Sequence, residues 1–371
     1  TLPWCPPLLP SPASFFAPLH LFLPPSAPSL ARTLPVLRPD FPLLPTALFS
    51  LPSLAPCFPL SPLSPRLRPS PRYLVRFWRL FLSQRPDIVH YQSFLKFPAI
   101  ELLMLELQKH KGARLVGTAH DWLPHHRRFY HRSLMSRYYR AFDRVVVHSR
   151  QGEQFLSERL GVKPELLAVV PHGDYGFFAS DPKLTREQAR ERLELDRERF
   201  WFLFFGRIDL HKGLDLALQA MPLAGAAGLI IAGNPERESI GKYLRLIAEL
   251  ELGERVKLFA GRIPVEQVQL YFRAADAVVL PYRESSTSGI AHVAMGFGLP
   301  IVATAVGGLV DVVEDGVTGL LTPPGDSKAL AAAMARTPGD EALRLRLATG
   351  WATARERHAW KRNEALTRTL Y

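Results

Sequence analysis

The sequence predicts an α/β protein with two Rossmann-like domains, and three observations point to this class. Short apolar runs alternate with amphipathic stretches of helical length from about residue 72 onward. Several of these runs are almost wholly apolar, as strands of a parallel sheet are when both faces are covered. With 371 residues, the chain is long enough for two domains that each bury a core.

In the N-terminal half, helices and strands alternate after a glycine-free beginning. We expect helices over 73–83, 98–110 and 151–160, and strands over 86–90, 113–120, 143–149 and 167–170. Gly112 and Gly161 follow the second and third helices, where glycine commonly ends a helix. This alternation implies a parallel sheet with helices on both faces.

The C-terminal half opens with an apolar strand at Phe200, followed by a turn and an amphipathic helix that reaches Met221. The turn holds Gly206-Arg207 and then Lys212-Gly213. Open α/β sheets bind ligands outside the carboxyl ends of their strands, so two cations at this place indicate an anionic ligand. Arginine can bind two phosphate oxygens at once, while lysine supplies a point charge. The alternative is a pair of solvated surface cations.

A second strand-to-helix corner covers residues 280–304. It comprises a buried strand that ends at Pro281, a loop over 284–289 rich in serine, a helix over 290–297 and a second strand, IVAT. Free N–H groups at a helix N-terminus are suited to an anion such as a diphosphate. Two such corners in one sheet favour a nucleotide-like ligand over an ordinary βαβ corner. The expected nucleotide contacts are Gly206, Gly233, Ser285, Ser288, Gly289 and Ile290.

Together these segments resemble the family-4 glycosyltransferases of the GT-B fold. The stretches that carry the resemblance are 204–213 (FFGRIDLHKG), 256–261 (VKLFAG), 294–304 and 307–326, together with Gly233 in LIIAGNPERE. The resemblance extends from about Arg72 to the C-terminus and is most specific between Phe200 and Asp326. It implies a GT-B protein whose N-terminal domain lacks its opening strands.

The resemblance implies a retaining transfer of a sugar from a nucleotide-diphosphate donor to a glycan, a lipid-linked acceptor or a small molecule, in surface polysaccharide or glycoconjugate biosynthesis. His120 would face the reacting sugar, Glu284 would contact the donor sugar, and Arg207 and Lys212 would stabilise the leaving diphosphate. Because these cations and the helix N-terminus neutralise the diphosphate, neither a metal nor any other cofactor is expected. No aspartate pair of the DxD type stands in a suitable loop of the sequence.

The sequence departs from the family pattern around the glycine-rich loop. Typical members carry glutamates at the positions of Ser285 and Val293, and Glu284 precedes the first of them by one residue. A valine cannot hydrogen-bond a ribose hydroxyl, so two alternatives stay open. One is a catalytically impaired GT-B scaffold that binds a nucleotide. The other is a different GT-B enzyme, such as a sugar-nucleotide epimerase.

The formal net charge of +12 suits an anionic donor or an anionic membrane surface. The sequence has none of the common nucleic-acid-binding motifs, so no nucleic acid partner is expected. Residues 127–143 have helical spacing and many arginines, with Phe129, Leu134, Tyr138 and Phe142 as an apolar set. This helix could lie on a membrane or pack its aromatics into the domain. The expected location is the cytoplasm or the inner face of the membrane.

The first 71 residues are a different kind of sequence, and they set the domain boundaries. Residues 1–72 contain 20 of the 34 prolines, both cysteines (Cys5 and Cys57) and no glycine. Frequent proline argues against a regular helix or an interior strand, so this segment is predicted to be non-native or disordered, with a proline-rich partner-binding tail as the alternative. We expect an N-terminal acceptor-side domain over 72–185, a donor-binding domain over 186–350, and a C-terminal helix over 351–371 that packs back toward the N-terminal domain.

Overall fold

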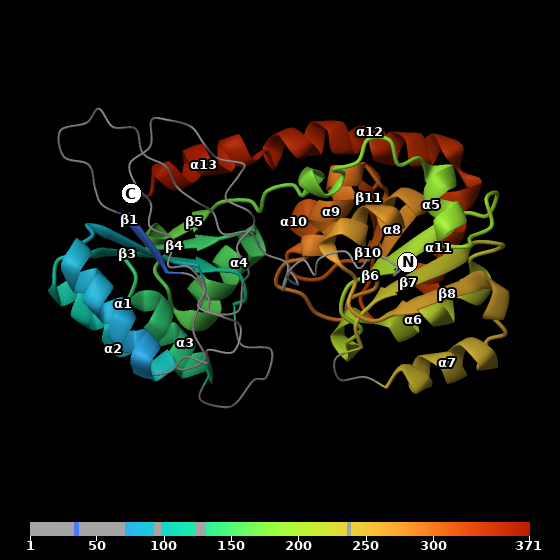
Figure 1. Cartoon of the computed structure of the whole chain (residues 1–371). Coiled ribbons are helices and arrows are strands. Elements are labelled where there is room, and N and C mark those ends of the chain that lie inside the picture. The colour runs from blue at the N-terminus through green and yellow to red at the C-terminus, as the bar shows by residue number, and fades with distance from the viewer. Residues whose placement is uncertain (1–32, 37–70, 93–97, 123–130, 236–238) are drawn as a thin grey trace, which may run out of the picture. The chain divides into compact units, whose positions relative to one another are not determined.

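The computed structural model describes residues 33–36, 71–92, 98–122, 131–235 and 239–371 (Figure 1). The described chain is α/β with two sheets, which confirms the predicted class. It divides into two compact units. The first comprises residues 1–118 and 133–145, and the second comprises residues 119–132 and 146–371.

The elements follow the predicted alternation of strands and helices, and most bounds agree within three residues. The strands are β1 (Thr33–Val36), β2 (Ile88–Tyr91), β3 (Arg114–Ala119), β4 (Arg144–Val147), β5 (Leu167–Val169), β6 (Trp201–Phe205), β7 (Gly228–Gly233), β8 (Val256–Ala260), β9 (Ala277–Leu280), β10 (Ile301–Thr304) and β11 (Gly319–Thr322). The α-helices are α1 (Pro71–Gln84), α2 (Pro98–His110), α3 (His131–Arg140), α4 (Arg150–Gln154), α5 (Arg186–Arg192), α6 (Leu214–Ala220), α7 (Ile240–Glu249), α8 (Val268–Ala274), α9 (Gly289–Phe297), α10 (Leu309–Val312), α11 (Ser327–Gly339), α12 (Glu341–Arg357) and α13 (Trp360–Arg368).

The first sheet has its strands in the order β1-β2-β3-β4-β5. The pairs β1/β2 and β2/β3 are parallel. Each described strand lies beside the one before it in the chain, so the strand order of this sheet does not reverse. A doubly wound sheet does reverse, which makes this order typical of one half of such a sheet.

The strand β1 corrects one part of the prediction for the first 71 residues. Thr33–Val36 pairs in parallel with β2, with Thr33 opposite Ile88. The proline content argued against an interior strand, but β1 stands at the edge of the sheet, where a strand needs hydrogen-bond donors on one side only. Pro35 is therefore compatible with this strand. Cys5, Cys57 and most of the segment lie outside the described residues.

The second sheet has six parallel strands in the order β11-β10-β9-β6-β7-β8. The chain builds β6, β7 and β8 in one direction, then returns to place β9 on the other side of β6. This is the strand order of a doubly wound dinucleotide-binding sheet, with its reversal between β6 and β9. Ligands of such sheets bind outside the carboxyl ends of the strands at that reversal.

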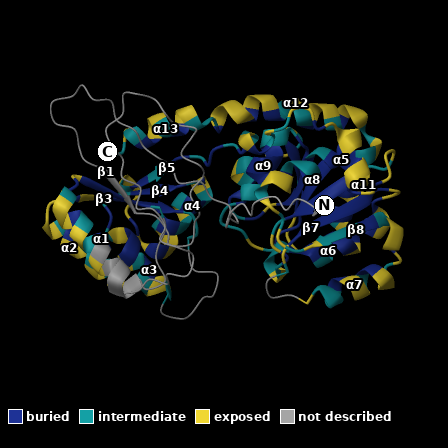
Figure 2. Cartoon of the chain, viewed as in Figure 1, coloured by how far each residue is buried: buried dark blue, intermediate teal, exposed yellow. Residues whose placement is uncertain are grey.

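Alternate residues of β6, β7, β9 and β10 face two separate hydrophobic cores. Trp201, Leu203 and Phe205 pack in the core that contains residues of α5, α8 and α9. Phe202 and Phe204 pack in the core that contains residues of α6, α7 and α11. Figure 2 shows β6 and β7 in the colour of buried residues and the outer faces of the helices as exposed. Burial on both faces explains why the β6 sequence is continuously apolar.

The basic helix predicted over 127–143 is α3 in the described residues, and it packs its aromatic side chains inward. Tyr138 and Phe142 are both 2% exposed, which agrees with the packing alternative. Arg132, Arg137 and Arg140 are exposed, whereas Phe129 lies outside the described residues. In the part of the chain that the structure describes, no helix has the length and hydrophobicity needed to span a bilayer.

The C-terminal helices α12 and α13 are held within the second unit by two indole groups. Trp351 Nε1 donates to the carbonyl of Leu299 over 2.8 Å. Trp360 Nε1 donates to the carbonyl of Asp174 over 2.8 Å. Asp174 follows β5, so α13 is bonded to the segment after β5.

Candidate active site

The candidate donor site lies at the reversal of the second sheet. The loop after β6 carries Arg207 and Lys212, and the loop after β9 is the predicted glycine- and serine-rich loop. Because β6 and β9 are hydrogen-bonded neighbours, their carboxyl ends place both loops together. The two corners found in the sequence therefore form one site.

Close backbone packing fixes the start of the β6 loop. Gly206 donates its N–H to the carbonyl of Ala232 over 2.9 Å. A Cβ on Gly233 would stand 1.6 Å from the carbonyl oxygen of Gly206, so glycine is required there. A Cβ on Gly206 would stand 3.6 Å from Cδ1 of Ile290. The β6 loop thus lies against the first turn of α9.

The end of the same loop is locked to the segment after β9. Gly213 has a positive φ of 69°, and a Cβ on it would stand 1.9 Å from the carbonyl oxygen of Pro281. The Nζ of Lys212 lies 3.8 Å from the ring centroid of Tyr282, which is buried. This cation–π contact holds the ammonium group at the reversal. Arg207 is exposed at the beginning of the loop.

An ion pair forms a second link between the loop after β6 and the loop after β9. Arg283 binds the carboxylate of Asp215 through both terminal nitrogens, at 2.8 and 2.7 Å. Burial raises the pKa of Asp215, but the hydrogen bonds and charge of Arg283 outweigh it, and the pKa lies below its usual value. Arg283 also donates its backbone N–H to the carbonyl of His211 over 2.8 Å. The guanidinium of Arg283 is therefore engaged with Asp215, while the neighbouring Glu284 is exposed.

The N-terminus of α9 has the geometry of an anion site. The Oγ of Ser288 caps the helix by accepting from the N–H of Ala291 at 3.4 Å. The N–H groups of Gly289 and Ile290 have no acceptor within the helix, as at any helix start. Ser285 donates its hydroxyl to the carbonyl of Thr287 over 2.9 Å, which stiffens the loop.

Val293, at the position of the second glutamate of the family, is fully buried in the core. A side chain there would have to leave the core to contact a nucleotide.

Hydroxyls of the same loop reach the segment that follows β3. Ser286 Oγ donates to Oδ1 of Asp121 over 2.8 Å. Thr287 Oγ1 donates to the carbonyl of His120 over 3.4 Å. His120, chosen from the resemblance as the residue that faces the sugar, is therefore bonded to the loop that carries Glu284.

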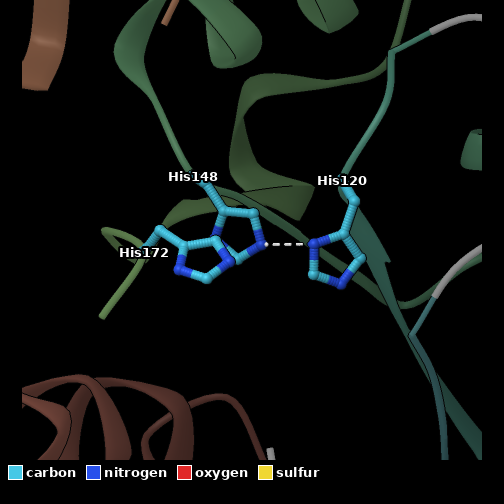
Figure 3. A group of neighbouring side chains, drawn as sticks. All are labelled: His120, His148 and His172. Atoms are coloured by element: carbon cyan, nitrogen blue, oxygen red, sulfur yellow. Dashed lines mark hydrogen bonds between the residues drawn. The ribbon is translucent and has the colours of Figure 1, made fainter. Parts of the chain in front are cut away.

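His120 belongs to a group of three histidines (Figure 3), each close to the end of a strand. His120 follows β3 directly, His148 follows β4 directly, and His172 stands three residues after β5. His148 Nε2 lies 3.1 Å from His120 Nδ1. The ring centroids of His148 and His172 are 5.0 Å apart. His172 is buried among the rings of His148, Tyr175 and His292.

Hydrogen bonds assign the protons of this group. His148 Nδ1 lies 2.9 Å from the carbonyl oxygen of Val170, which can only accept, so Nδ1 carries the proton. In the neutral ring Nε2 is then an acceptor, and His120 must donate to it from Nδ1. Nδ1 of His120 is therefore the donor in this pair. Burial lowers the pKa of His148 and, with the charges of neighbouring histidines, that of His172, so both rings are neutral at pH 7.

A fourth histidine, His292 on α9, packs against this group. His292 is 2% exposed, and its ring centroid lies 4.9 Å from that of His172. Its Nδ1 donates to the carbonyl of Ser288 over 2.9 Å. Burial, followed by the charge of His358, lowers the pKa of His292 to about 3.

The structure thus brings together most of the residues predicted from the sequence. Gly206, Lys212, Gly233, Ser285, Ser288, Gly289 and Ile290 line the two joined loops, with Arg207 and Glu284 exposed on them and His120 bonded beside them. Sequence reasoning missed Asp215, Tyr282 and His148. His148 could have been found, since it occupies the same strand-end position as His120.

Comparison with known proteins gives the family. The model of glycosyltransferase family 4 matches residues 53–173, and that of glycosyl transferases group 1 matches residues 199–340. The first match begins before Arg72, where the resemblance in the sequence was expected to start. The chain belongs to the family-4 glycosyltransferases and has the GT-B fold.

Individual relatives agree with this assignment. The chain is 33% identical over 239 residues to a D-inositol 3-phosphate glycosyltransferase of Xylanimonas cellulosilytica, which covers 62% of this chain and 57% of that protein. The chain spans about half the length of the curated relatives it matches. The sucrose-phosphate synthase of Thermosynechococcus elongatus superposes with a TM-score of 0.69 at 25% identity, covering 81% of this chain and 77% of that one. Anabaena HepE in complex with UDP-glucose gives a TM-score of 0.69 at 21% identity, covering 81% and 84%.

Proposed function

We propose that this protein transfers a sugar from a nucleotide-diphosphate donor to a hydroxyl acceptor with retention at the anomeric carbon. One observation carries the proposal. The loop with Arg207 and Lys212 and the N-terminus of α9 meet at the reversal of a six-stranded parallel sheet, which is where such sheets bind phosphate-bearing ligands. The proposed acceptors are glycans, lipid-linked sugars or small molecules of surface polysaccharide or glycoconjugate synthesis.

Charge stabilisation is the chemical role of this site. When the bond between the anomeric carbon and the diphosphate breaks, negative charge grows on the diphosphate oxygens. Arg207, Lys212 and the N–H groups of Gly289 and Ile290 are positioned to stabilise that charge. Preorganised groups of this kind often supply the largest part of catalysis. Two cations already fixed in the protein can take the place of a divalent ion.

His120 is proposed to orient the donor sugar. Its Nδ1 is bonded to His148, and its carbonyl accepts from Thr287, which places His120 beside the loop that carries Glu284. Glu284 on the adjoining loop is proposed as a second sugar contact.

The alternative is a scaffold that binds a nucleotide without transferring a sugar. The observation in its favour is Val293, which puts an apolar, buried side chain at the position of the ribose-binding glutamate. The two functions differ in one outcome, because both bind a nucleotide and only the enzyme releases a nucleoside diphosphate when an acceptor is present.

A panel of nucleotide sugars tests the proposal. Thermal-shift screening identifies the donor, since a ligand of the native state raises the apparent stability. UDP-glucose should be tried first, because HepE holds it in a similar fold. Transfer from the best donor should then give a product of unchanged anomeric configuration by NMR. A donor that binds but is never consumed with any acceptor would support the scaffold instead.

The same assay tests independence from metal. EDTA should not lower the transfer rate, because cationic side chains and backbone amides neutralise the diphosphate. Loss of turnover in EDTA, restored by Mg²⁺ or Mn²⁺, would contradict this part of the proposal.

A further inference from the structure

The three neighbouring histidines His120, His148 and His172 have a chemistry that donor binding does not require. One ring nitrogen from each lies within 4.8 Å of the others. In Figure 3 a nitrogen of each ring points toward the same space. The three residues belong to the second unit, and neutral imidazole is among the commonest ligands of Zn²⁺ in proteins.

In His148 and His172, the ring nitrogen that would not bind the metal is hydrogen-bonded as in metal-binding histidines. A metal ligand usually donates its other ring N–H to a backbone carbonyl or carboxylate, which fixes the tautomer and aims the lone pair. His148 does so through Nδ1 to Val170 O at 2.9 Å. His172 Nδ1 faces Gly173 O at 3.3 Å. In both rings Nε2 is left as the lone-pair atom, and that of His172 lies 3.2 Å from the hydroxyl of Tyr175.

The spacing is near that of a tetrahedral site. With Zn–N bonds of about 2.0–2.1 Å, ligand nitrogens lie roughly 3.4 Å apart. The His120 and His148 nitrogens are 3.1 Å apart. The three ligand nitrogens all lie within 4.8 Å of one another, so the most distant pair has to approach by about 1.4 Å at most. His120 needs only to move its proton from Nδ1 to Nε2. A water molecule, or the hydroxyl of Tyr175, would complete the set.

We propose that His120, His148 and His172 bind Zn²⁺ or a similar borderline transition-metal ion, and that the bound ion inhibits sugar transfer. The inhibition rests on the proposed function, because the metal takes His120 away from the donor sugar. The ion is not a cofactor of the reaction. Binding of the nucleoside diphosphate by Arg207 and Lys212 stays unaffected, since neither residue is a ligand.

The test uses the full chain, freed of metal with EDTA and moved into chelator-free buffer. Calorimetric titration with ZnCl₂ should show one bound equivalent, and Co²⁺ should give the visible absorption of a tetrahedral site. His148→Gln and His172→Asn should each weaken Zn²⁺ binding at least about tenfold, since even changes to outer-shell partners cost that much. His110→Gln is the matched control, because His110 is exposed at the end of α2.

A second control addresses other histidines. The sequence places His125 and His126 side by side, outside the described residues. If His125→Gln/His126→Gln abolishes Zn²⁺ binding while His172→Asn, checked to be folded, leaves it unchanged, the proposed site is wrong. Absence of any binding would overturn it equally.

Activity separates this proposal from the proposed function. Zn²⁺ should lower transfer at unchanged nucleotide affinity, and EDTA should restore it. Zn²⁺ binding at the three histidines without an effect on transfer would overturn the inhibition. If no transfer is found under any condition, the proposed function fails, yet the titrations still decide the metal site.

Discussion

The two sheets of this chain differ in strand order, and the difference locates their functional groups. The second sheet reverses between β6 and β9, and its predicted cations and its free helix N-terminus stand at that reversal. The described strands of the first sheet run in sequence without a reversal, and β3, β4 and β5 lead into histidines instead. The second sheet thus carries cations and a helix N-terminus that suit an anion. The first sheet leads into histidines, which accept hydrogen bonds and are proposed to bind a metal.

The largest expected effect comes from a glycine at the reversal. Gly213→Ala places a Cβ into the carbonyl of Pro281 at a positive φ, and should cost about 2–5 kcal/mol, the sum of strain and overpacking. Gly112→Ala in the first unit is the matched control. Gly112 has a φ of 90° but nothing within 4 Å of a Cβ, so only about 1–2 kcal/mol is expected. Urea unfolding measures both, and equal losses would show that the loops are not tightly packed.

The histidines should make the stability depend on pH. Unfolded His292 takes up a proton near pH 6.5, whereas the folded protein keeps it neutral down to about pH 3. Its stabilisation is therefore complete above pH 6.5 and declines as the pH falls, by about 1.4 kcal/mol per pH unit, or roughly 2 kcal/mol at pH 5. Urea unfolding at pH 7 and 5, with EDTA present, should show a smaller loss in His292→Gln. An identical loss in both proteins would contradict the assignment.

A smaller effect is expected from the ion pair that joins the two loops. Asp215→Asn should reduce stability by about 1 kcal/mol, because the pair is only partly shielded from water. It should also weaken nucleotide binding, since the loops lose one of their links. Glu314→Gln is the matched control, as its pair with Arg357 is half exposed on both sides. A loss in the control as large as in Asp215→Asn would show that the link between the loops has no special role.

The smallest effect is expected from the N-terminal segment. Deleting residues 1–70 removes β1, an edge strand of the first sheet, and nothing from the second sheet. Nucleoside-diphosphate affinity should stay within about twofold, which is less than 0.5 kcal/mol. The melting temperature should also change little, because β1 pairs with one neighbouring strand only. A melting temperature that falls sharply would show that the segment is a structural part of the protein.

Much of the fold could be predicted from local sequence, because a strand that is buried on both faces, such as residues 202–205, has a continuously apolar sequence. The turn glycines Gly206 and Gly213 likewise mark the loop between β6 and α6. The strand β1 was missed since its proline is tolerated only at an edge, and edge position is a property of the whole sheet.

The site was only partly predictable from the sequence, because several of its contacts depend on which strands are neighbours in the sheet. Arg207 and Lys212 could be found from their place after a strand. The pairing of Arg283 with Asp215, and the contact of Lys212 with Tyr282, depend on β6 and β9 being neighbours, which no local pattern contains. The meeting of three histidines depends in the same way on the order of β3, β4 and β5.

One measurement tests the central claim, that the reversal of the second sheet binds the diphosphate of the donor. Nucleoside-diphosphate affinity is measured for Arg207→Ala, Lys212→Ala and Arg262→Ala, each checked to be folded. Arg262 is the matched control, because this exposed cation follows β8, the edge strand of the same sheet. Arg207→Ala and Lys212→Ala should each lose about 1.5–3 kcal/mol, roughly 10- to 150-fold in affinity, while Arg262→Ala binds like the unmodified protein. Unchanged affinity in both loop variants would contradict the account.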